Sequence, residues 1–175
     1  YLLSDTFPSL TLVLGGQRSG KSAHAEGLIG HDQEALYVAT AQALDKEMGE
    51  RVAAHKGRRG KNWTTVEEPL DLATTLLTND KAGRPILIDS LAMWVSNLLT
   101  SDEDVEKRTL ALVQAMENIK SSLVIVSDEV GLGIIPDNAL ARRFIDKLGT
   151  LNQIIAARAD TVIFVAAGLP THLKG

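Results

Sequence analysis

A glycine-rich run near the start of the chain carries the most recognisable chemistry. Eight consecutive residues, Gly15-Gly16-Gln17-Arg18-Ser19-Gly20-Lys21-Ser22, fit the pattern Gly-x-x-x-x-Gly-Lys-Ser/Thr. The glycines let the backbone curl so that successive N–H groups point at phosphate oxygens. Lys21 would then reach the β- and γ-phosphates of ATP or GTP, and the Ser22 hydroxyl would bind Mg²⁺. The run predicts a nucleoside triphosphate site; the alternative is a chance match in a glycine-rich turn.

A second candidate is the carboxylate that closes an apolar strand, Pro85-Ile86-Leu87-Ile88-Asp89. In enzymes with such a phosphate-binding loop, an acid in this place positions Mg²⁺ directly or through water. We therefore predict Asp89 as a magnesium residue. An aspartate after a buried strand can also simply cap the next helix.

One histidine lies in basic surroundings. Arg51, His55 and Arg59 recur at i, i+4 and i+8, so they share one face of an expected helix, with Arg58 beside them. Nearby positive charge favours the neutral imidazole, which is a nucleophile, and the guanidinium groups could hold the phosphates it attacks. The residues alone favour the simpler interpretation, a surface histidine among basic neighbours. The other histidines do not lie in such a basic cluster and are expected at the surface: His24, His31 and His172.

Strands and helices alternate along the chain. The strand candidates are Leu10–Leu14, Ala35–Ala39, Thr64–Val66, Pro85–Asp89, Leu123–Ser127 and Thr161–Ala166. The helix candidates are Lys21–Ile29, Leu44–Arg59, Leu70–Thr78, Leu91–Leu99, Val105–Lys120 and Asn138–Arg158. Apolar strands alternating with helices predict one α/β domain over residues 1–175, with a mostly parallel sheet covered by helices on both faces.

In such sheets, ligands bind at the carboxyl ends of the strands. The segments expected to form the binding rim are 15–22, 40–43, 67–68, 89–90, 127–133 and 167–170.

Composition restricts the possible partners. The net charge is -4, which argues against a nucleic-acid-binding protein, and no apolar run approaches the ~20 residues that span a membrane. The chain has no cysteine, hence no disulfide or thiolate metal site, and shows no secretory signal, so we expect a cytoplasmic protein. The basic cluster between Arg51 and Lys61 suits a small polyphosphate, or is a solvated helix face.

These motifs, with others along nearly the whole chain, resemble the bifunctional adenosylcobinamide kinase / adenosylcobinamide-phosphate guanylyltransferase family of cobalamin biosynthesis. The matching stretches, in family order, are Gly15–Ser22, Leu36–Ala41, Arg51–Lys56, Trp63–Glu67, Leu87–Leu91, Trp94–Leu99, Glu129–Pro136, Leu151–Gln153 and Ala167–Pro170. The phosphate-binding loop alone is unspecific, whereas the ordered set is highly specific.

The resemblance implies two reactions, a RecA-like fold and a trimer. The first reaction phosphorylates the terminal hydroxyl of the aminopropanol arm of adenosylcobinamide with ATP or GTP. The second transfers GMP from GTP to adenosylcobinamide phosphate, and it yields adenosylcobinamide-GDP and pyrophosphate. Mg²⁺ is the expected cofactor, the partners are the corrinoid and the nucleotides, and neither nucleic acid nor a membrane span is expected.

The resemblance also assigns roles to residues. His55 occupies the place of the histidine that becomes covalently guanylylated, which reverses the interpretation drawn from the residues alone. The family's nucleotide contacts carry over to Gly15–Ser22, Ala39, Thr40, Ala41, Lys56, Gly57, Arg58, Arg59, Glu67 and Asp89. Asp128 departs from the pattern, because the family typically has asparagine there, and an extra carboxylate could alter magnesium or corrinoid binding.

Two other functions would account for part of the sequence. A plain kinase of another small alcohol would explain Lys21 and Asp89 but not the basic residues around His55. A RecA-like ATP-driven motor would need a DNA-binding surface, for which an acidic chain of 175 residues offers little room.

Overall fold

The computed structural model describes residues 9–42 and 59–175. They contain seven strands, β1 (Leu10–Gly15), β2 (Ala35–Ala39), β3 (Trp63–Glu67), β4 (Ile86–Asp89), β5 (Leu123–Asp128), β6 (Thr161–Ala166) and β7 (Leu169–Lys174). The helices among them are α1 (Lys21–Ile29), α3 (Leu72–Thr78), α4 (Leu91–Thr100), α5 (Val105–Asn118) and α6 (Ala139–Arg158). The expected helix Leu44–Arg59 lies outside the described residues, apart from Arg59.

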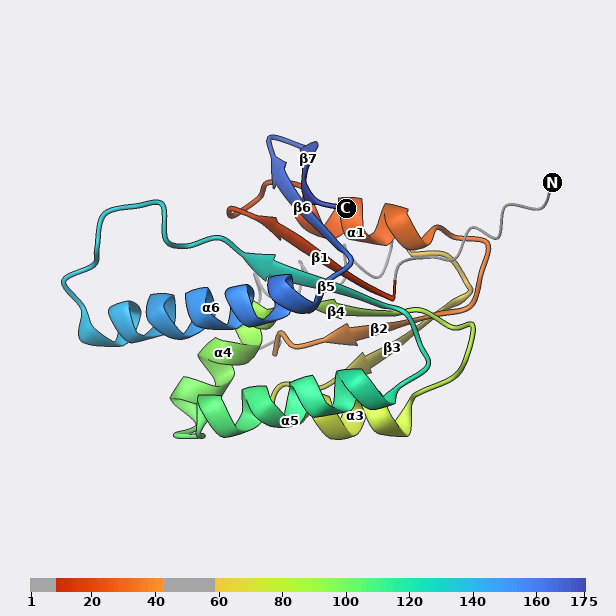
Figure 1. The fold of residues 1–175 in the computed structure, drawn as a ribbon, viewed down its shortest axis with the longest axis horizontal. Coiled ribbons are helices and arrows are strands. Elements are labelled where there is room, and N and C mark those ends of the chain that lie inside the picture. The colour runs from red at the N-terminus through yellow and green to blue at the C-terminus, as the bar shows by residue number, and fades with distance from the viewer. Residues whose placement is uncertain (1–8, 43–58) are drawn as a thin grey trace.

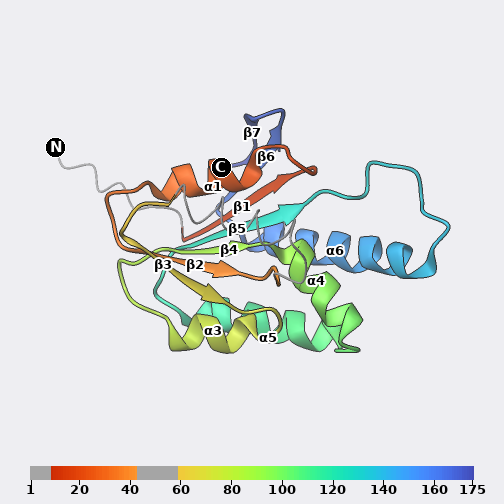
Figure 2. The same ribbon diagram turned by 180° about the vertical axis from the view of Figure 1, so that it is seen from behind.

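All seven strands form one sheet, in the order β3-β2-β4-β5-β1-β6-β7. Every pair is parallel except β6 with β7, which is antiparallel. Figure 1 shows α1 on one face of the sheet and α3, α4, α5 and α6 on the other, and Figure 2 shows the same arrangement from behind. The prediction of a mostly parallel sheet with helices on both faces is confirmed.

The strands supply both halves of the core because successive side chains point to opposite faces. Leu12 and Ile125 pack with the four helices of one face, whereas Val13 and Val124 pack with α1 on the other. Both faces are covered, which explains why these strands are apolar throughout rather than alternating with polar residues.

Most of the described helices begin at a side-chain cap. Asp71, Ser90, Asp104 and Asn138 each accept a hydrogen bond from a backbone N–H in the first turn of α3, α4, α5 and α6. Such a cap satisfies one of the N–H groups that the helix itself leaves without a partner. Helix α1 differs among the described helices: Gly20 precedes it in a left-handed conformation (φ 93°), and no side chain caps it. The N–H groups at the start of α1 are therefore available to a ligand.

No helix within residues 9–42 and 59–175 is long and apolar enough to cross a membrane.

Candidate active site

The strand register brings the predicted site residues to one edge of the sheet. Ala39 lies opposite both Glu67 and Asp89, and Gly15 lies opposite Asp128. Because these residues end their strands, they line the carboxyl edge, where ligands of parallel sheets bind. Their contact with a nucleotide stays a prediction.

The phosphate-binding loop, residues 15–22, is closed by short-range contacts. The N–H of Ser19 donates to the carbonyl oxygen of Gly16 at 3.2 Å, and the Nζ of Lys21 donates to the same carbonyl at 3.1 Å. A side chain on Gly15 would place its Cβ 2.4 Å from Oγ of Ser19 and 2.6 Å from the carbonyl oxygen of Val165, so only glycine fits there. The backbone thus forms a tight loop at Gly15 and Gly16, as the sequence pattern predicts.

A second loop supports the phosphate-binding loop from the side. The N–H of Gly168, in the turn between β6 and β7, donates to the carbonyl oxygen of Ser19 at 2.8 Å. A Cβ on Gly20 would lie 3.2 Å from the Cα of Gly168, so the two backbones meet closely.

Lys21 forms an ion pair within the site. Its Nζ lies 2.5 Å from Oδ1 of Asp128, and the two side chains are only 11% and 22% exposed. The sequence pattern predicts that Lys21 binds phosphate, but it does not show that a carboxylate lies against it.

Asp89 is held by the strand next to it. The hydroxyl of Tyr37 on β2 donates to Oδ2 of Asp89 at 2.8 Å. Burial, followed by the nearby Asp89 carboxylate, raises the pKa of Tyr37, so this hydroxyl keeps its proton. The alternative role of Asp89 as a helix cap is wrong, because Ser90 caps α4.

The segment after β2 is locked to the start of α4. Oγ1 of Thr40 donates to the carbonyl oxygen of Ser90 at 2.7 Å and accepts from its N–H at 2.8 Å. Nδ2 of Asn97 donates to the carbonyl oxygen of Thr40 at 2.8 Å. The Thr40 hydroxyl is therefore occupied by hydrogen bonds within the protein. A hydrogen bond from Ala39, Thr40 or Ala41 to a nucleotide would then come from the backbone.

Arg59 is buried beside the site. Its guanidinium lies 3.5 Å from the centroid of the Tyr37 ring, and its Nη1 lies 3.6 Å from Oε1 of Glu26 on α1. Nη2 donates to Oγ1 of Thr65 at 3.4 Å. The sequence did not predict these contacts. They connect Arg59, near the end of the basic cluster, to the helix that follows the phosphate-binding loop. His55, Lys56, Gly57 and Arg58 lie outside the described residues.

Two of the three other histidines are exposed, as expected, and His24 is half-buried. His31 and His172 are exposed, whereas Nε2 of His24 is buried and has no hydrogen-bond partner among the described residues. Burial, followed by the charge of His172, lowers the pKa of His24.

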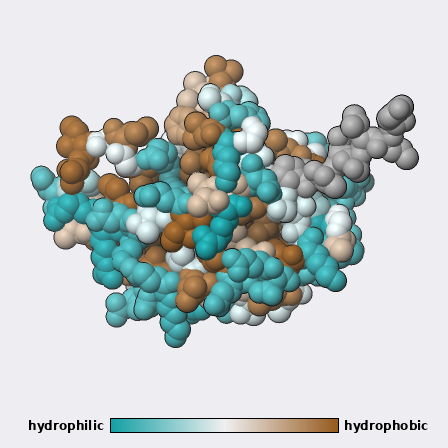
Figure 3. All heavy atoms as spheres, in the orientation of Figure 1, coloured by the Kyte–Doolittle hydropathy of each residue, from teal (hydrophilic) through white to brown (hydrophobic). Residues whose placement is uncertain are grey.

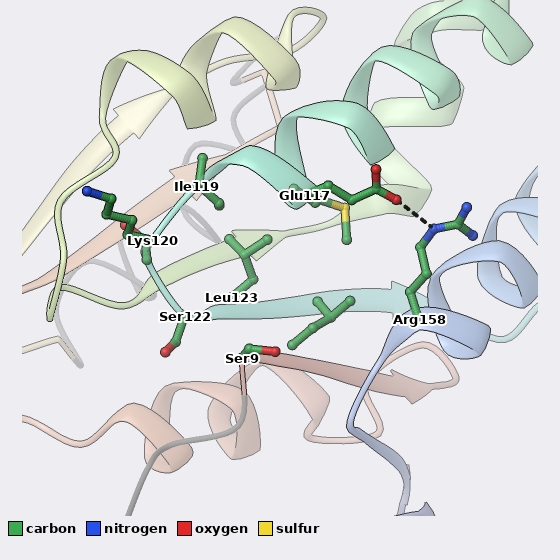
Figure 4. A pocket seen from close by; sticks show the side chains of 10 residues that line it. Ser9, Glu117, Ile119, Lys120, Ser122, Leu123 and Arg158 are labelled. Carbon is green, nitrogen blue, oxygen red and sulfur yellow. Dashed lines mark ion pairs between the residues drawn. The ribbon is translucent and has the colours of Figure 1, made fainter.

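A cavity of about 320 Å³ lies at the opposite edge of the sheet (Figure 4). It opens at the amino ends of β1 and β5, between Ser9, Lys120 and Ser122, and the ion pair of Glu117 with Arg158 (3.8 Å) lines it. None of the predicted site residues lines this cavity, so it is separate from the phosphate-binding loop.

Comparison with solved structures supports the fold. The chain is similar to an ATPase from the type III secretion system of pathogenic bacteria, with a TM-score of 0.50 and 12% identity. The likeness covers 93% of this chain and 56% of that one. At this low identity it shows the fold alone.

Comparison with curated proteins identifies relatives along almost the full length. The bifunctional adenosylcobalamin biosynthesis protein CobP of Pseudomonas aeruginosa is 46% identical over 167 residues, which cover 94% of this chain and 96% of the relative. The corresponding CobU protein of Salmonella typhimurium is 40% identical, and that of Escherichia coli is 34% identical, each over 94% of this chain and 99% of the relative. The pattern of the CobU family, described as cobinamide kinase / cobinamide phosphate guanyltransferase, matches residues 11–173. With the phosphate-binding loop, Asp89 and the sheet edge in place, this chain belongs to the cobinamide kinase / cobinamide phosphate guanyltransferase family.

Proposed function

We propose that this chain carries out two successive reactions at the carboxyl edge of its sheet. It phosphorylates the terminal hydroxyl of adenosylcobinamide with ATP or GTP, and it then transfers GMP from GTP to adenosylcobinamide phosphate. The observation that carries the proposal is the phosphate-binding loop at the start of the uncapped helix α1, in a chain of the cobinamide kinase / cobinamide phosphate guanyltransferase family. The description of the family names both activities, and the relatives are named as bifunctional proteins of adenosylcobalamin biosynthesis.

In the kinase reaction, the protein positions the triphosphate and neutralises its charge. The N–H groups of the loop and of α1 bind phosphate oxygens, and the Lys21 ammonium offsets the charge on the β- and γ-phosphates. The substrate hydroxyl attacks the γ-phosphorus and loses its proton. A new P–O bond forms while the bond to the β–γ bridging oxygen breaks.

Ser22 and Asp89 are the residues that we propose hold Mg²⁺. Mg²⁺ prefers oxygen ligands, and in nucleotide sites it takes one or two carboxylates and fills its shell with phosphate oxygens and water. The described residues fit this arrangement because they place the Asp89 carboxylate at the carboxyl edge of the sheet. When bound, the ion would offset the negative charge of the phosphates.

His55 is the proposed nucleophile of the second reaction, on the strength of the family pattern. An imidazole nitrogen attacks the α-phosphorus of GTP, and the bond to the α–β bridging oxygen breaks, which releases pyrophosphate. A phosphate oxygen of adenosylcobinamide phosphate then attacks the same phosphorus, and the P–N bond breaks. Lys56, Gly57, Arg58, Arg59 and Glu67 are proposed nucleotide contacts.

We also propose a homo-oligomer, because a corrinoid is too large for a pocket inside one small domain. The resemblance to the family favours a trimer. Because both reactions consume nucleoside triphosphates, we also propose that they take place in the cytoplasm.

Labelled GTP tests the proposal. The chain is incubated with GTP labelled at the α-phosphate, denatured, and examined for bound label. We expect an acid-labile, base-stable adduct that His55→Ala abolishes, while kinase activity persists. His31→Ala, which removes an exposed histidine, is the control and should keep the adduct.

Lys21→Ala should lower both activities by ~10²-fold or more, because both begin with a bound triphosphate. A kinase without label on the protein would favour phosphorylation of another small alcohol. An adduct that persists in His55→Ala would show that another residue is the nucleophile.

A further inference from the structure

Asp128 lies between the two parts of the nucleotide site. It ends β5, the strand that separates β1, which leads into the phosphate-binding loop, from β4, which ends at Asp89 (Figure 1). In the register, Asp128 lies opposite Gly15, and Val126 of the same strand lies opposite Asp89. A carboxylate at this point faces the place where the phosphates would bind.

The carboxylate of Asp128 is paired with the lysine that should bind phosphate. Oδ1 lies 2.5 Å from Nζ of Lys21, and both side chains are largely buried. The same Oδ1 is buried and accepts no well-aligned hydrogen bond from the described residues, and the Lys21 ammonium is the charged group that lies against it. Water screens such a partly buried pair less than a surface pair.

The backbone around Asp128 is fixed, which keeps the carboxylate near the loop. Nδ2 of Asn152 donates to the carbonyl oxygen of Asp128 at 3.1 Å, and Oδ1 of Asn152 accepts from the buried hydroxyl of Ser127 at 2.6 Å. On the other side, the N–H of Glu129 donates to the carbonyl oxygen of Gly15 at 3.1 Å.

We propose that Asp128 makes this chain select magnesium-bound nucleotides over free nucleotides. The inference rests on the proposed function only in placing the phosphates at the loop. A free di- or triphosphate must compete with the Asp128 carboxylate for the Lys21 ammonium, and the carboxylate also repels it. A divalent cation on the phosphates offsets that repulsion. Asp128 thereby acts as a specificity-determining residue through charge alone.

Equilibrium binding tests this proposal without any turnover. Binding of fluorescently labelled GDP is measured with Mg²⁺ and with EDTA for the wild type, for Asp128→Asn and for Glu34→Gln. We expect Asp128→Asn to bind GDP in EDTA about tenfold more tightly than the wild type, because the removed charge is close to the phosphates. Binding with Mg²⁺ should change less, so the ratio of the two dissociation constants should shrink.

Glu34→Gln is the matched control. Glu34 also pairs with a lysine, with Oε2 2.7 Å from Nζ of Lys81, but it precedes β2 and so lies at the opposite edge of the sheet. The ratio should stay at its wild-type value in this variant. Asp128→Ser, checked with Asp128→Asn for an unchanged unfolding temperature, should repeat the effect of the asparagine.

An unchanged ratio in both Asp128 variants would overturn the proposal. Equal weakening with and without Mg²⁺ would also overturn it, because Asp128 would then only position Lys21. Other results would contradict the proposed function instead. These are a wild type that does not bind GDP with Mg²⁺, or one that binds GDP normally but forms no adduct with GTP labelled at the α-phosphate.

Discussion

Tyr37 joins two charged groups of the site at the scale of single residues. Its hydroxyl donates to Asp89, and its ring lies under the guanidinium of Arg59. Because burial and the Asp89 carboxylate raise the pKa of Tyr37, the donor is present over the whole working pH range. A permanent donor on one oxygen holds the Asp89 carboxylate in one orientation.

Tyr37→Phe should therefore raise the Mg²⁺ concentration that gives half-maximal kinase activity. The ring under Arg59 stays, and only the hydrogen bond is lost, so about 0.5–1.5 kcal/mol, or about 2- to 10-fold, is expected. The measurement is a Mg²⁺ titration of the kinase rate. Thr65→Val, which removes a hydroxyl that contacts Arg59 but not Asp89, should leave the titration unchanged. An unaltered Mg²⁺ dependence in Tyr37→Phe would show that Asp89 is oriented without the tyrosine.

The residue types and spacing predicted the phosphate-binding loop and Asp89, because both motifs are local in sequence. The contacts of Tyr37 with Asp89 and of Lys21 with Asp128 could not be predicted in the same way. The first joins β2 to β4 and the second joins α1 to β5, and which side chains meet depends on strand order and register. The position of Asp128 at the end of an apolar strand was the available signal.

At the scale of elements, the six predicted strands are present, with bounds that differ by one residue at most at each end. Strand β7 was missed. All of its residues are exposed, and Pro170 and His172 interrupt any apolar pattern. The hydrophobicity pattern of the sequence therefore does not indicate a strand that pairs with β6. Gly168, in the turn that leads into β7, nevertheless donates a hydrogen bond to Ser19 of the phosphate-binding loop.

The contact between α6 and β5 gives a prediction about stability. Asn152 on α6 bonds the buried Ser127 hydroxyl and the Asp128 carbonyl at the end of β5. Asn152→Ala should lower the free energy of unfolding by about 1–3 kcal/mol, because these buried groups lose their partner. Urea denaturation measures the change. Gln153→Ala, at the exposed neighbouring position, should cost far less, and equal losses in the two variants would contradict the assigned role of Asn152.

The effect of the His172 charge on β7 upon His24 on α1 gives a prediction about pH. Since the pKa of His24 is lowered in the folded chain, the unfolded chain binds the proton more readily. This histidine therefore costs no stability above its ordinary pKa of 6.5, and stability is lost as the pH falls below that value. His172→Gln should raise the pKa of His24 only part of the way to 6.5, because burial is the larger cause. NMR titration of the His24 imidazole tests this, and an unmoved pKa would rule out a charge effect from β7.

At the scale of the whole molecule, the fold class followed from the alternation of apolar strands with helices, whereas the strand order did not. The order places β5 between β1 and β4, and so brings Asp128 into the site. Alternation constrains which elements exist, but neighbouring strands are chosen by packing over the whole sheet. That one domain spans residues 1–175 stays a prediction.

The surface beyond the carboxyl edge is unusually apolar. Leu132, Ile134 and Ile135, in the loop between β5 and α6, are 83%, 97% and 77% exposed. Figure 3 shows apolar side chains gathered over this loop and over β7, where Leu169 and Leu173 are also exposed. Side chains of this kind usually lie in an interface when they cluster on a surface.

We therefore expect this loop to pack against another copy of the chain in the proposed trimer. Multi-angle light scattering of the wild type at micromolar concentration should give a mass near three times the 18.8 kDa of one chain. Ile134→Asp should lower that mass, because a charge buried in an apolar interface has no partner. Leu77→Asp, at an exposed leucine on α3, is the matched control and should keep the wild-type mass. A wild-type mass of one chain would contradict the trimer. A mass that is unchanged in Ile134→Asp would show that the interface lies elsewhere on the surface.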